Sequence, residues 1–243
     1  MKVKYLGKKN SSKILDYSPS LLDSVERLHT PSSNYYGIDY WNAYEFSYLN
    51  ASSQQKLETL EIKIPADSKI TVESKSLKIY LASFYKKKFK ASINAYQLIA
   101  KDLSKLLQSK IMVSKKNFYE EAPKAFLLNR SDAMVPKNKI IRYEGFRSIC
   151  PVTSQPDWAN IYIHSSSNAL DAKKIIKLLK SFKERGDFHE ACIDSIFTSL
   201  MHDFHINDLT VCGRFLRRGG IDINPIRSSK KKIFFNNFRD FNQ

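Results

Sequence analysis

A candidate nucleophile lies in a loop rich in proline and small polar residues. Cys150 opens the run Cys-Pro-Val-Thr-Ser-Gln-Pro-Asp-Trp, which ends in Asp157 and Trp158. A thiol is the most nucleophilic of the neutral side chains, and a nearby cation that lowers its pKa strengthens it. A carboxyl group against an apolar wall such as Trp158 can stay protonated near neutral pH and act as an acid. These residues fit a nucleophile, Cys150, with Asp157 as its proton donor; the alternative is a buried cysteine beside a turn.

A second candidate set lies at the start of a stretch with helical spacing, where His189 and Glu190 are neighbours. A carboxylate in the first turn of a helix interacts favourably with the helix dipole, so Glu190 can be purely structural. His189 at the same helix end can likewise be a structural hydrogen-bonding residue. The functional alternative is that Glu190 accepts two N–H donors from a heterocycle, a contact that fixes both identity and orientation.

Two further runs combine polar and cationic residues. Glu73-Ser74-Lys75-Ser76 interrupts an alternating apolar pattern, which predicts either a solvated sheet edge or a bend that faces a ligand, with Lys75 on a phosphate. Arg217-Arg218-Gly219-Gly220 predicts a cationic turn. Its glycines allow close approach of the backbone, and guanidinium groups bind phosphate through their fork geometry.

The sequence gives little support to a metal site. Cys150, Cys192 and Cys212 lie 42 and 20 positions apart, without a C-x-x-C pair. His202 and His205 are three positions apart and have no strong third ligand nearby, whereas a zinc site needs three or four such ligands. We therefore expect no metal.

Composition sets wider bounds. The chain has 243 residues, 42% of them apolar and 26% charged, which is typical of one large or two small globular domains. A net charge of +16 would suggest a nucleic acid or another anionic partner, but a bias toward Lys, Asn, Ile and Ser indicates compositional drift. Three cysteines exclude a disulfide scaffold, and neither a signal peptide nor a membrane span is indicated. We expect a soluble, cytoplasmic protein.

The elements that must position these residues follow from apolar periodicity. The first 55 or so residues are expected to form an irregular lead-in that ends in one or two strands. Apolar residues then alternate as in strands at residues 60–64, 70–72 and 77–81, and take helical spacing over 91–109 before a short strand at 111–113.

The second half has a clearer order. Its pattern predicts strands at 139–149 and 159–164, helices at 169–183 and 189–204, and strands at 209–216 and 221–226. Short connections between such elements favour an α+β fold of antiparallel sheets with helices on one face. The first half resembles a degraded copy of this order, which predicts two similar domains, 1–120 and 121–243. No Gly-x-Gly-x-x-Gly follows a strand, so a Rossmann cofactor site is not supported.

Taken in order, the motifs resemble one family. They are Glu73-Ser74-Lys75-Ser76, Cys150-Pro151-Val152-Thr153 with Gln155-Pro156-Asp157, Phe188-His189-Glu190, and Arg217-Arg218-Gly219-Gly220 with Ile221-Asp222-Ile223-Asn224-Pro225. Together they resemble the NADPH-dependent 7-cyano-7-deazaguanine reductases (the QueF family) in their long, two-domain form, over residues 57–228. The resemblance implies tandem tunnelling-fold units of ββααββ order. It also implies reduction of a nitrile to a primary amine with two NADPH, in the pathway to the queuosine base of tRNA.

The resemblance also assigns roles. Cys150 would attack the nitrile carbon to form a covalent thioimide while Asp157 protonates the nitrogen. Substrate-binding residues would be Val72, Glu73, Ser74, His189 and Glu190, and NADPH would contact Ser74, Lys75, Arg218 and Gly219. Because these residues come from both halves of the chain, we expect the site to form where domains or subunits meet. We also expect at least a homodimer, and no direct contact with nucleic acid or membrane.

A protective disulfide is a further hypothesis. Cys192 lies one helical turn after His189, on the same side of the expected helix. If that helix directs His189 toward Cys150, a reversible Cys150–Cys192 bond would protect the nucleophile from overoxidation. The alternative is a buried helix cysteine.

Two rival functions remain open from the residues alone. A basic nucleic-acid-binding module would explain the net charge and would bind with steep salt dependence, but it has no use for Cys150 or Asp157. A tunnelling-fold enzyme of another reaction, such as a cyclohydrolase, would want metal ligands.

Overall fold

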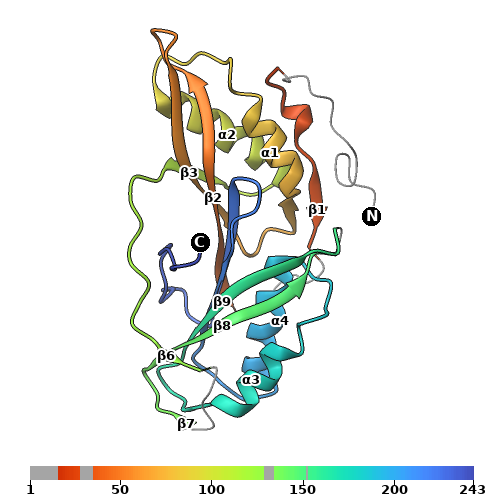
Figure 1. Cartoon of the computed structure of the whole chain (residues 1–243), viewed down its shortest axis with the longest axis vertical. Coiled ribbons are helices and arrows are strands. Elements are labelled where there is room, and N and C mark those ends of the chain that lie inside the picture. Colours follow the sequence, from red (N-terminus) through yellow and green to blue (C-terminus); the bar gives the residue numbers. More distant parts are fainter. Residues whose placement is uncertain (1–15, 28–34, 129–133, 152) are drawn as a thin grey trace. The chain divides into compact units, whose positions relative to one another are not determined.

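The computed structural model describes residues 16–27, 35–128, 134–151 and 153–243, which form two compact units (Figure 1). The first contains Tyr40–Phe118, Arg217–Asp222 and the described part of Met1–Thr30. The second contains Tyr119–Leu216, Ile223–Gln243 and the described part of Pro31–Asp39. The predicted division after residue 120 lies close to the change of unit between Phe118 and Tyr119. The two exchanged segments, 31–39 and 217–222, were not expected.

The first unit combines a sheet with two helices. Strands β2 (Tyr36–Leu49), β3 (Gln55–Pro65) and β5 (Met112–Lys115) are neighbours in the order β5-β3-β2, and β2 extends into the second unit. Helices α1 (Ser74–Ala82) and α2 (Ser92–Leu107) lie together on one side of these strands (Figure 1). A 3-10 turn, η1 (Pro19–Leu21), and a small antiparallel pair, β1 (Ser24–Glu26) with β4 (Ile70–Val72), complete the described part.

One expectation for this unit was wrong. Residues 77–81 belong to α1 rather than to a strand. Leu77, Tyr80 and Leu81 are buried, and their i, i+3, i+4 spacing places them on one helical face. The expected strand at the end of the first 55 residues is β2, a 14-residue strand in which aromatic residues such as Trp41 and Phe46 are buried.

The second unit has the predicted order of strand, strand, helix, helix, strand, strand. The elements are β8 (Ile140–Ile149), β9 (Pro156–His164), α3 (Ala172–Lys180), α4 (His189–His202), β11 (Thr210–Phe215) and β12 (Ile221–Ser228), the last of which begins in the first unit. β12, β11, β9 and β8 are neighbours in that order, with antiparallel pairing. β6 (Phe126–Leu127) pairs parallel to β8, and β7 (Met134–Val135) pairs with β10 (Leu170–Asp171). The α+β class with antiparallel sheets is confirmed.

One face of this sheet packs on the helices. Alternate residues of the strands, such as Ile161 and Ile163 of β9 and Val211 of β11, join buried residues of α3 and α4 in one apolar core. This period of two is what places every second side chain of a strand on the helix side. The helices therefore hold their N-terminal residues in a fixed relation to β9 and β11.

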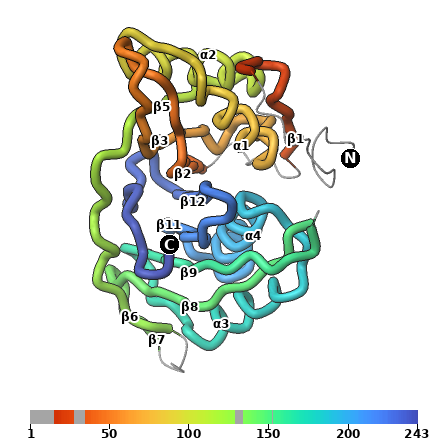
Figure 2. Tube along the Cα trace, turned by 45° about the horizontal axis from the view of Figure 1, so that its top comes forward, coloured from red at the N-terminus to blue at the C-terminus, as the bar shows by residue number. Residues whose placement is uncertain are grey.

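The opposite face is covered by the C-terminal segment, residues 229–243, which runs beside β9 and β11 (Figure 2). Phe238 and Phe235 pack edge-on against Tyr162 of β9, with ring centroids 4.9 and 6.2 Å away. All three rings are buried. This segment seals the sheet face that the helices leave uncovered.

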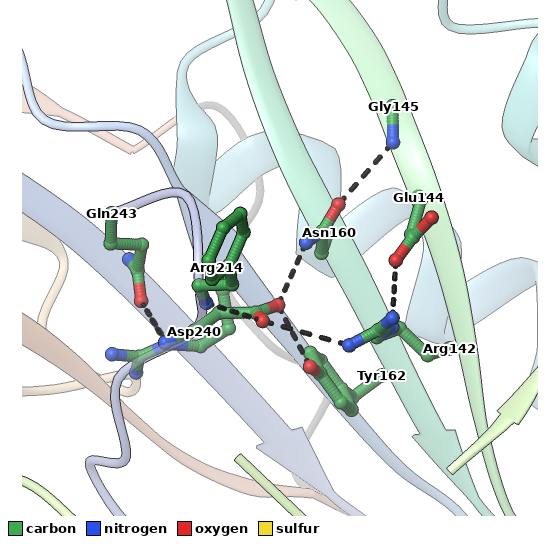
Figure 3. Close-up of polar contacts among 9 residues, drawn as sticks. Arg142, Glu144, Gly145, Asn160, Tyr162, Arg214, Asp240 and Gln243 are labelled. Carbon is green, nitrogen blue, oxygen red and sulfur yellow. Dashed lines mark hydrogen bonds and ion pairs between the residues drawn. The ribbon is translucent and has the colours of Figure 1, made fainter. Parts of the chain in front are cut away.

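A buried polar network fastens the same segment (Figure 3). The Asp240 carboxylate accepts hydrogen bonds from Asn160 Nδ2 at 2.8 Å and from the Tyr162 hydroxyl at 2.7 Å. Gln243 accepts from Arg214 Nε at 3.0 Å and donates to the Phe215 carbonyl at 2.9 Å. Buried polar groups are stable only when paired in this way, so the segment and β11 are fixed to one another.

Candidate active site

Cys150 directly follows β8, in a closed turn. Its N–H donates to the Gln155 carbonyl at 2.9 Å, and its carbonyl accepts from Ser154 N–H at 3.0 Å. Ser154 adopts a left-handed conformation, with φ of 55°. The thiol is free and partly exposed. The turn therefore presents the Cys150 thiol, the candidate nucleophile, directly after the end of β8.

The structure brings Asp157 and His189 together. Asp157 is the second residue of β9, is buried, and pairs in register with Ser148 of β8, two positions before Cys150. Its Oδ2 lies 3.3 Å from Nε2 of His189, the first residue of α4. The His189 ring in turn stacks on Phe215, with ring centroids 4.0 Å apart. A carboxyl and an imidazole in contact can hold and pass a proton.

Glu190 and Cys192 both lie in the first turn of α4. Both are buried. Burial raises the pKa of the Cys192 thiol to about 12, and its Sγ lies 3.9 Å from the Asp187 carbonyl oxygen. Cys150 and Cys192 are both free thiols in this structure. The disulfide stays a prediction, and the raised pKa of Cys192 disfavours the thiolate that would form it.

The Glu-Ser-Lys-Ser motif starts α1 and lies in the first unit. Glu73 is the N-cap residue, and its carboxylate accepts from the N–H groups of Lys75 at 2.8 Å and Ser76 at 2.7 Å. Glu73 is buried, as is the preceding Val72 at the end of β4. The motif is therefore a helix start, with Ser74 and Lys75 in the first turn, rather than the sheet edge or bend between strands that the sequence suggested.

Lys78 is a cationic residue that the sequence reasoning missed. An ideal Cβ built on Gly219 would lie 3.3 Å from Lys78 Nζ, so the ammonium lies against the turn that carries Arg217 and Arg218. Gly219 has φ of +58°, a conformation that favours glycine. Lys78 follows Lys75 by three positions and shares its helix face; the signal was lost because a strand was expected there.

The same turn is fixed to β2. The Tyr44 N–H donates to the Gly220 carbonyl at 2.9 Å, and the Arg217 guanidinium lies 4.9 Å from the centre of the Tyr44 ring. Gly220 has φ of +78°, a conformation that favours glycine, and a Cβ there would lie 2.7 Å from the Glu45 carboxyl carbon and displace that side chain. The turn is thus a cationic surface with a close backbone approach.

The candidate residues fall into two sets. Cys150, Asp157, His189 and Glu190 belong to the second unit, and Val72, Glu73, Ser74, Lys75, Arg218 and Gly219 to the first. Within each set the structure places the residues on connected elements. That both sets form one site stays a prediction.

Metal-binding and membrane-spanning features were also sought. Among the described residues, no group of three or more His, Cys, Asp or Glu side chains is placed to hold a metal ion. Of the helices in the described ranges, none is long and apolar enough to cross a membrane.

Two family models match the chain. The one described as "Nitrile reductase, 7-cyano-7-deazaguanine-reductase N-term" matches residues 15–115, and "QueF-like protein" matches residues 156–234. The matches fall on the two halves that the motif order distinguished.

Curated relatives agree with these models. The NADPH-dependent 7-cyano-7-deazaguanine reductase of Coxiella burnetii (strain RSA 493 / Nine Mile phase I) is 33% identical over 94% of this chain and 92% of its own length. Those of Hahella chejuensis and Teredinibacter turnerae are 32% and 34% identical, each over 88% of this chain and over 89% and 87% of their own lengths. The resemblance seen in the motifs is confirmed: the chain belongs to the 7-cyano-7-deazaguanine reductase family.

Proposed function

We propose that this protein reduces the nitrile of 7-cyano-7-deazaguanine with NADPH, to give 7-aminomethyl-7-deazaguanine for tRNA queuosine biosynthesis. The names of its relatives indicate this activity. The observation that carries the proposal is the 3.3 Å contact between Asp157 and His189. Asp157 lies on the β8–β9 hairpin that presents Cys150, and His189 is the first residue of α4.

Cys150 would act as the nucleophile. Its sulfur forms a C–S bond with the nitrile carbon, and one of the C–N π bonds breaks as the nitrogen takes a proton from Asp157. The thiol proton passes to the Asp157–His189 pair, so protons and electrons balance in a covalent thioimide without another reagent. Covalent catalysis of this kind replaces one difficult step with easier ones.

Glu190 would recognise the heterocycle. It is buried in the first turn of α4, one residue after His189. A carboxylate that accepts two N–H donors discriminates strongly by charge and geometry. His189 and Glu190 would therefore fix the nitrile relative to Cys150. Val72, Glu73 and Ser74 of the first unit stay expected substrate-binding residues, and the bonds from Glu73 to the α1 backbone set the position of the first turn there.

The first unit has residues that fit NADPH. Ser74 and Lys75 lie at the start of α1. Lys78 lies against the Arg218–Gly219 turn, because a Cβ on Gly219 would be 3.3 Å from Lys78 Nζ. Cations together with a close backbone approach suit phosphate groups. NADPH, when bound, supplies the hydrides for the reduction, and Ser74, Lys75, Lys78, Arg218 and Gly219 would hold it.

One assay tests the proposal. Protein mixed with 7-cyano-7-deazaguanine and NADPH should lose nicotinamide absorbance, and without NADPH it should gain the mass of the nitrile. Cys150→Ala should abolish both signals. Cys212→Ala is the matched control, because Cys212 is a buried thiol on the sheet face opposite the helices; it should retain both. A wild-type protein that consumes no NADPH with this nitrile would overturn the proposal.

Three expectations accompany this function. We propose a homodimer and a cytoplasmic location, without direct binding of nucleic acid. Light scattering of the purified protein tests for the homodimer. Failure to retain RNA at both low and high salt concentration would support the absence of nucleic-acid binding.

A further inference from the structure

The orientation of His189 raises a physical question. A functional imidazole is normally oriented by a hydrogen bond to the nitrogen that does not take part in the chemistry. In His189, Nε2 faces Asp157 at 3.3 Å. Its Nδ1 is buried and has no hydrogen-bond partner among the residues that the structure describes. Another contact must therefore restrict rotation of the ring.

Phe215 provides that contact. Its ring stacks on the His189 ring with centroids 4.0 Å apart and an angle of 15° between the planes. Phe215 is the last residue of β11 and is completely buried. If the imidazole turned about its side-chain bond, its edge would enter the space of the phenyl ring. The stack thus holds the plane of the imidazole, and within that plane the contact with Asp157 keeps Nε2 toward the carboxylate.

The position of Phe215 is itself closely determined. An ideal Cβ on Gly213 would lie 2.9 Å from Phe215 Cε2 and 2.7 Å from Ile193 Cδ1. Gly213 therefore leaves the space that the phenyl ring occupies. The Phe215 carbonyl accepts a hydrogen bond from Gln243 Nε2 at 2.9 Å, which fixes the end of the strand from the other face.

We propose that Phe215 is a positioning residue, which orients His189 toward Asp157 by ring stacking. This inference rests on the proposed nitrile reduction. A hydrogen bond at Nδ1 would orient the ring through one nitrogen atom, whereas a stacked ring orients it through its whole face. Phe215 thereby holds the imidazole in the plane that contains Asp157.

The kinetic test measures formation of the Cys150 adduct without NADPH. Phe215→Leu should lower the rate constant by about 10- to 100-fold, the typical effect of a slightly misplaced catalytic group, with little change in nitrile affinity. Phe215→Tyr keeps an aromatic ring and should recover most of the rate. Phe182→Leu is the matched control, because Phe182 is equally buried in the same core without the His189 contact. It should lose similar thermal stability and keep the adduct rate.

A spectroscopic test does not depend on activity. The stacked phenyl ring should shift the imidazole proton signals of His189 upfield, and His189→Gln assigns them among the five histidines. Phe215→Leu should remove this shift, and Phe182→Leu should keep it. Unchanged His189 signals or an unchanged adduct rate in Phe215→Leu would overturn the inference. A wild-type protein that forms no adduct would instead contradict the proposed function, while the proton signals would still test the stack.

Discussion

The starts of α1 and α4 use the same residue type in opposite ways. Glu73 stands at the N-cap of α1, where its carboxylate binds two backbone N–H groups. In α4 the N-cap is Phe188, which has no polar side chain, and Glu190 lies inside the first turn. A carboxylate caps a helix from the N-cap position. Glu73 therefore caps its helix from the N-cap position, a place that Glu190 does not hold in α4.

Helix α3 provides a reference for this comparison. Its N-cap, Asp171, accepts from the Lys174 N–H at 3.0 Å, and its side chain is 34% exposed. The first helix of each unit thus begins with a carboxylate cap. The cap of α1 is buried and that of α3 is not, which indicates that burial rather than capping sets the Glu-Ser-Lys-Ser motif apart.

The largest expected contrast lies between two thiols near the start of α4. Burial raises the pKa of Cys192 to about 12, so its thiol is almost entirely neutral at pH 8. Iodoacetamide at pH 8 should alkylate the partly exposed Cys150 and spare Cys192, as peptide mass spectrometry would show. Because the thiolate fraction rises with pH, labelling of Cys192 should increase only as the pH approaches 12 or the protein unfolds. Equal labelling of both thiols at pH 8 would contradict a buried, neutral Cys192.

Glu190→Gln tests the ligand side of the comparison. Loss of a charge-assisted contact of about 1.5–3 kcal/mol should weaken nitrile binding by about 10- to 100-fold. The free energy of unfolding should change less, because glutamine keeps the size of the buried side chain and one acceptor oxygen. Isothermal calorimetry with the Cys150→Ala protein measures the affinity without chemistry. A large loss of stability with normal affinity would place Glu190 with Glu73, as a structural residue.

Lys78→Ala tests the cationic side of α1. Removal of one phosphate contact should raise KM for NADPH by about 10-fold, a typical effect for a charged hydrogen bond. Adduct formation without NADPH should stay at the wild-type rate. The control is Lys174→Ala, which removes a lysine from the first turn of α3. If both variants change KM equally, the effect belongs to overall charge and not to this turn.

Glu73→Ala should have the smallest effect on chemistry and a clear effect on stability. Loss of an N-cap carboxylate costs about 0.5–2 kcal/mol, and a buried cap belongs at the upper end. Asp171→Ala, at the more exposed cap of α3, should cost less. Chemical denaturation compares the two. A Glu73→Ala protein of normal stability and no activity would show that Glu73 serves the ligand more than the helix.

Much of the fold could be predicted from periodicity alone. The helices at 92–107 and 172–180 and the strands at 140–149 and 210–215 agree with the predicted segments within a few residues. The sequence predicted a strand for residues 77–81, which is wrong. Leu77, Ile79 and Leu81 alternate as in a strand, but Leu77, Tyr80 and Leu81 also repeat as in a helix, so the pattern alone does not decide. Burial of Tyr80 on the helical face decides between them.

The residues of the candidate site also divide into those that could be predicted from the sequence and those that could not. Cys150, Asp157, His189 and Glu190 could be proposed because their side-chain types suit the chemistry and stand in a characteristic order. Lys78 was not, since its role depends on contact with Gly219, far along the chain. Phe215 was not recognised either, because a phenylalanine in a strand pattern is typical of any core.

By itself, the sequence determined the family and the class of reaction, and it supplied the candidate residues, because these depend on side-chain chemistry and local order. Only the tertiary structure decided which of those residues meet. Segments that are distant in sequence meet in the Asp157–His189 contact and in the stack of Phe215 on His189. Cys192 is buried because such segments pack around it. Such contacts arise when β9, β11 and α4 pack into one core, and no local pattern of residues specifies them.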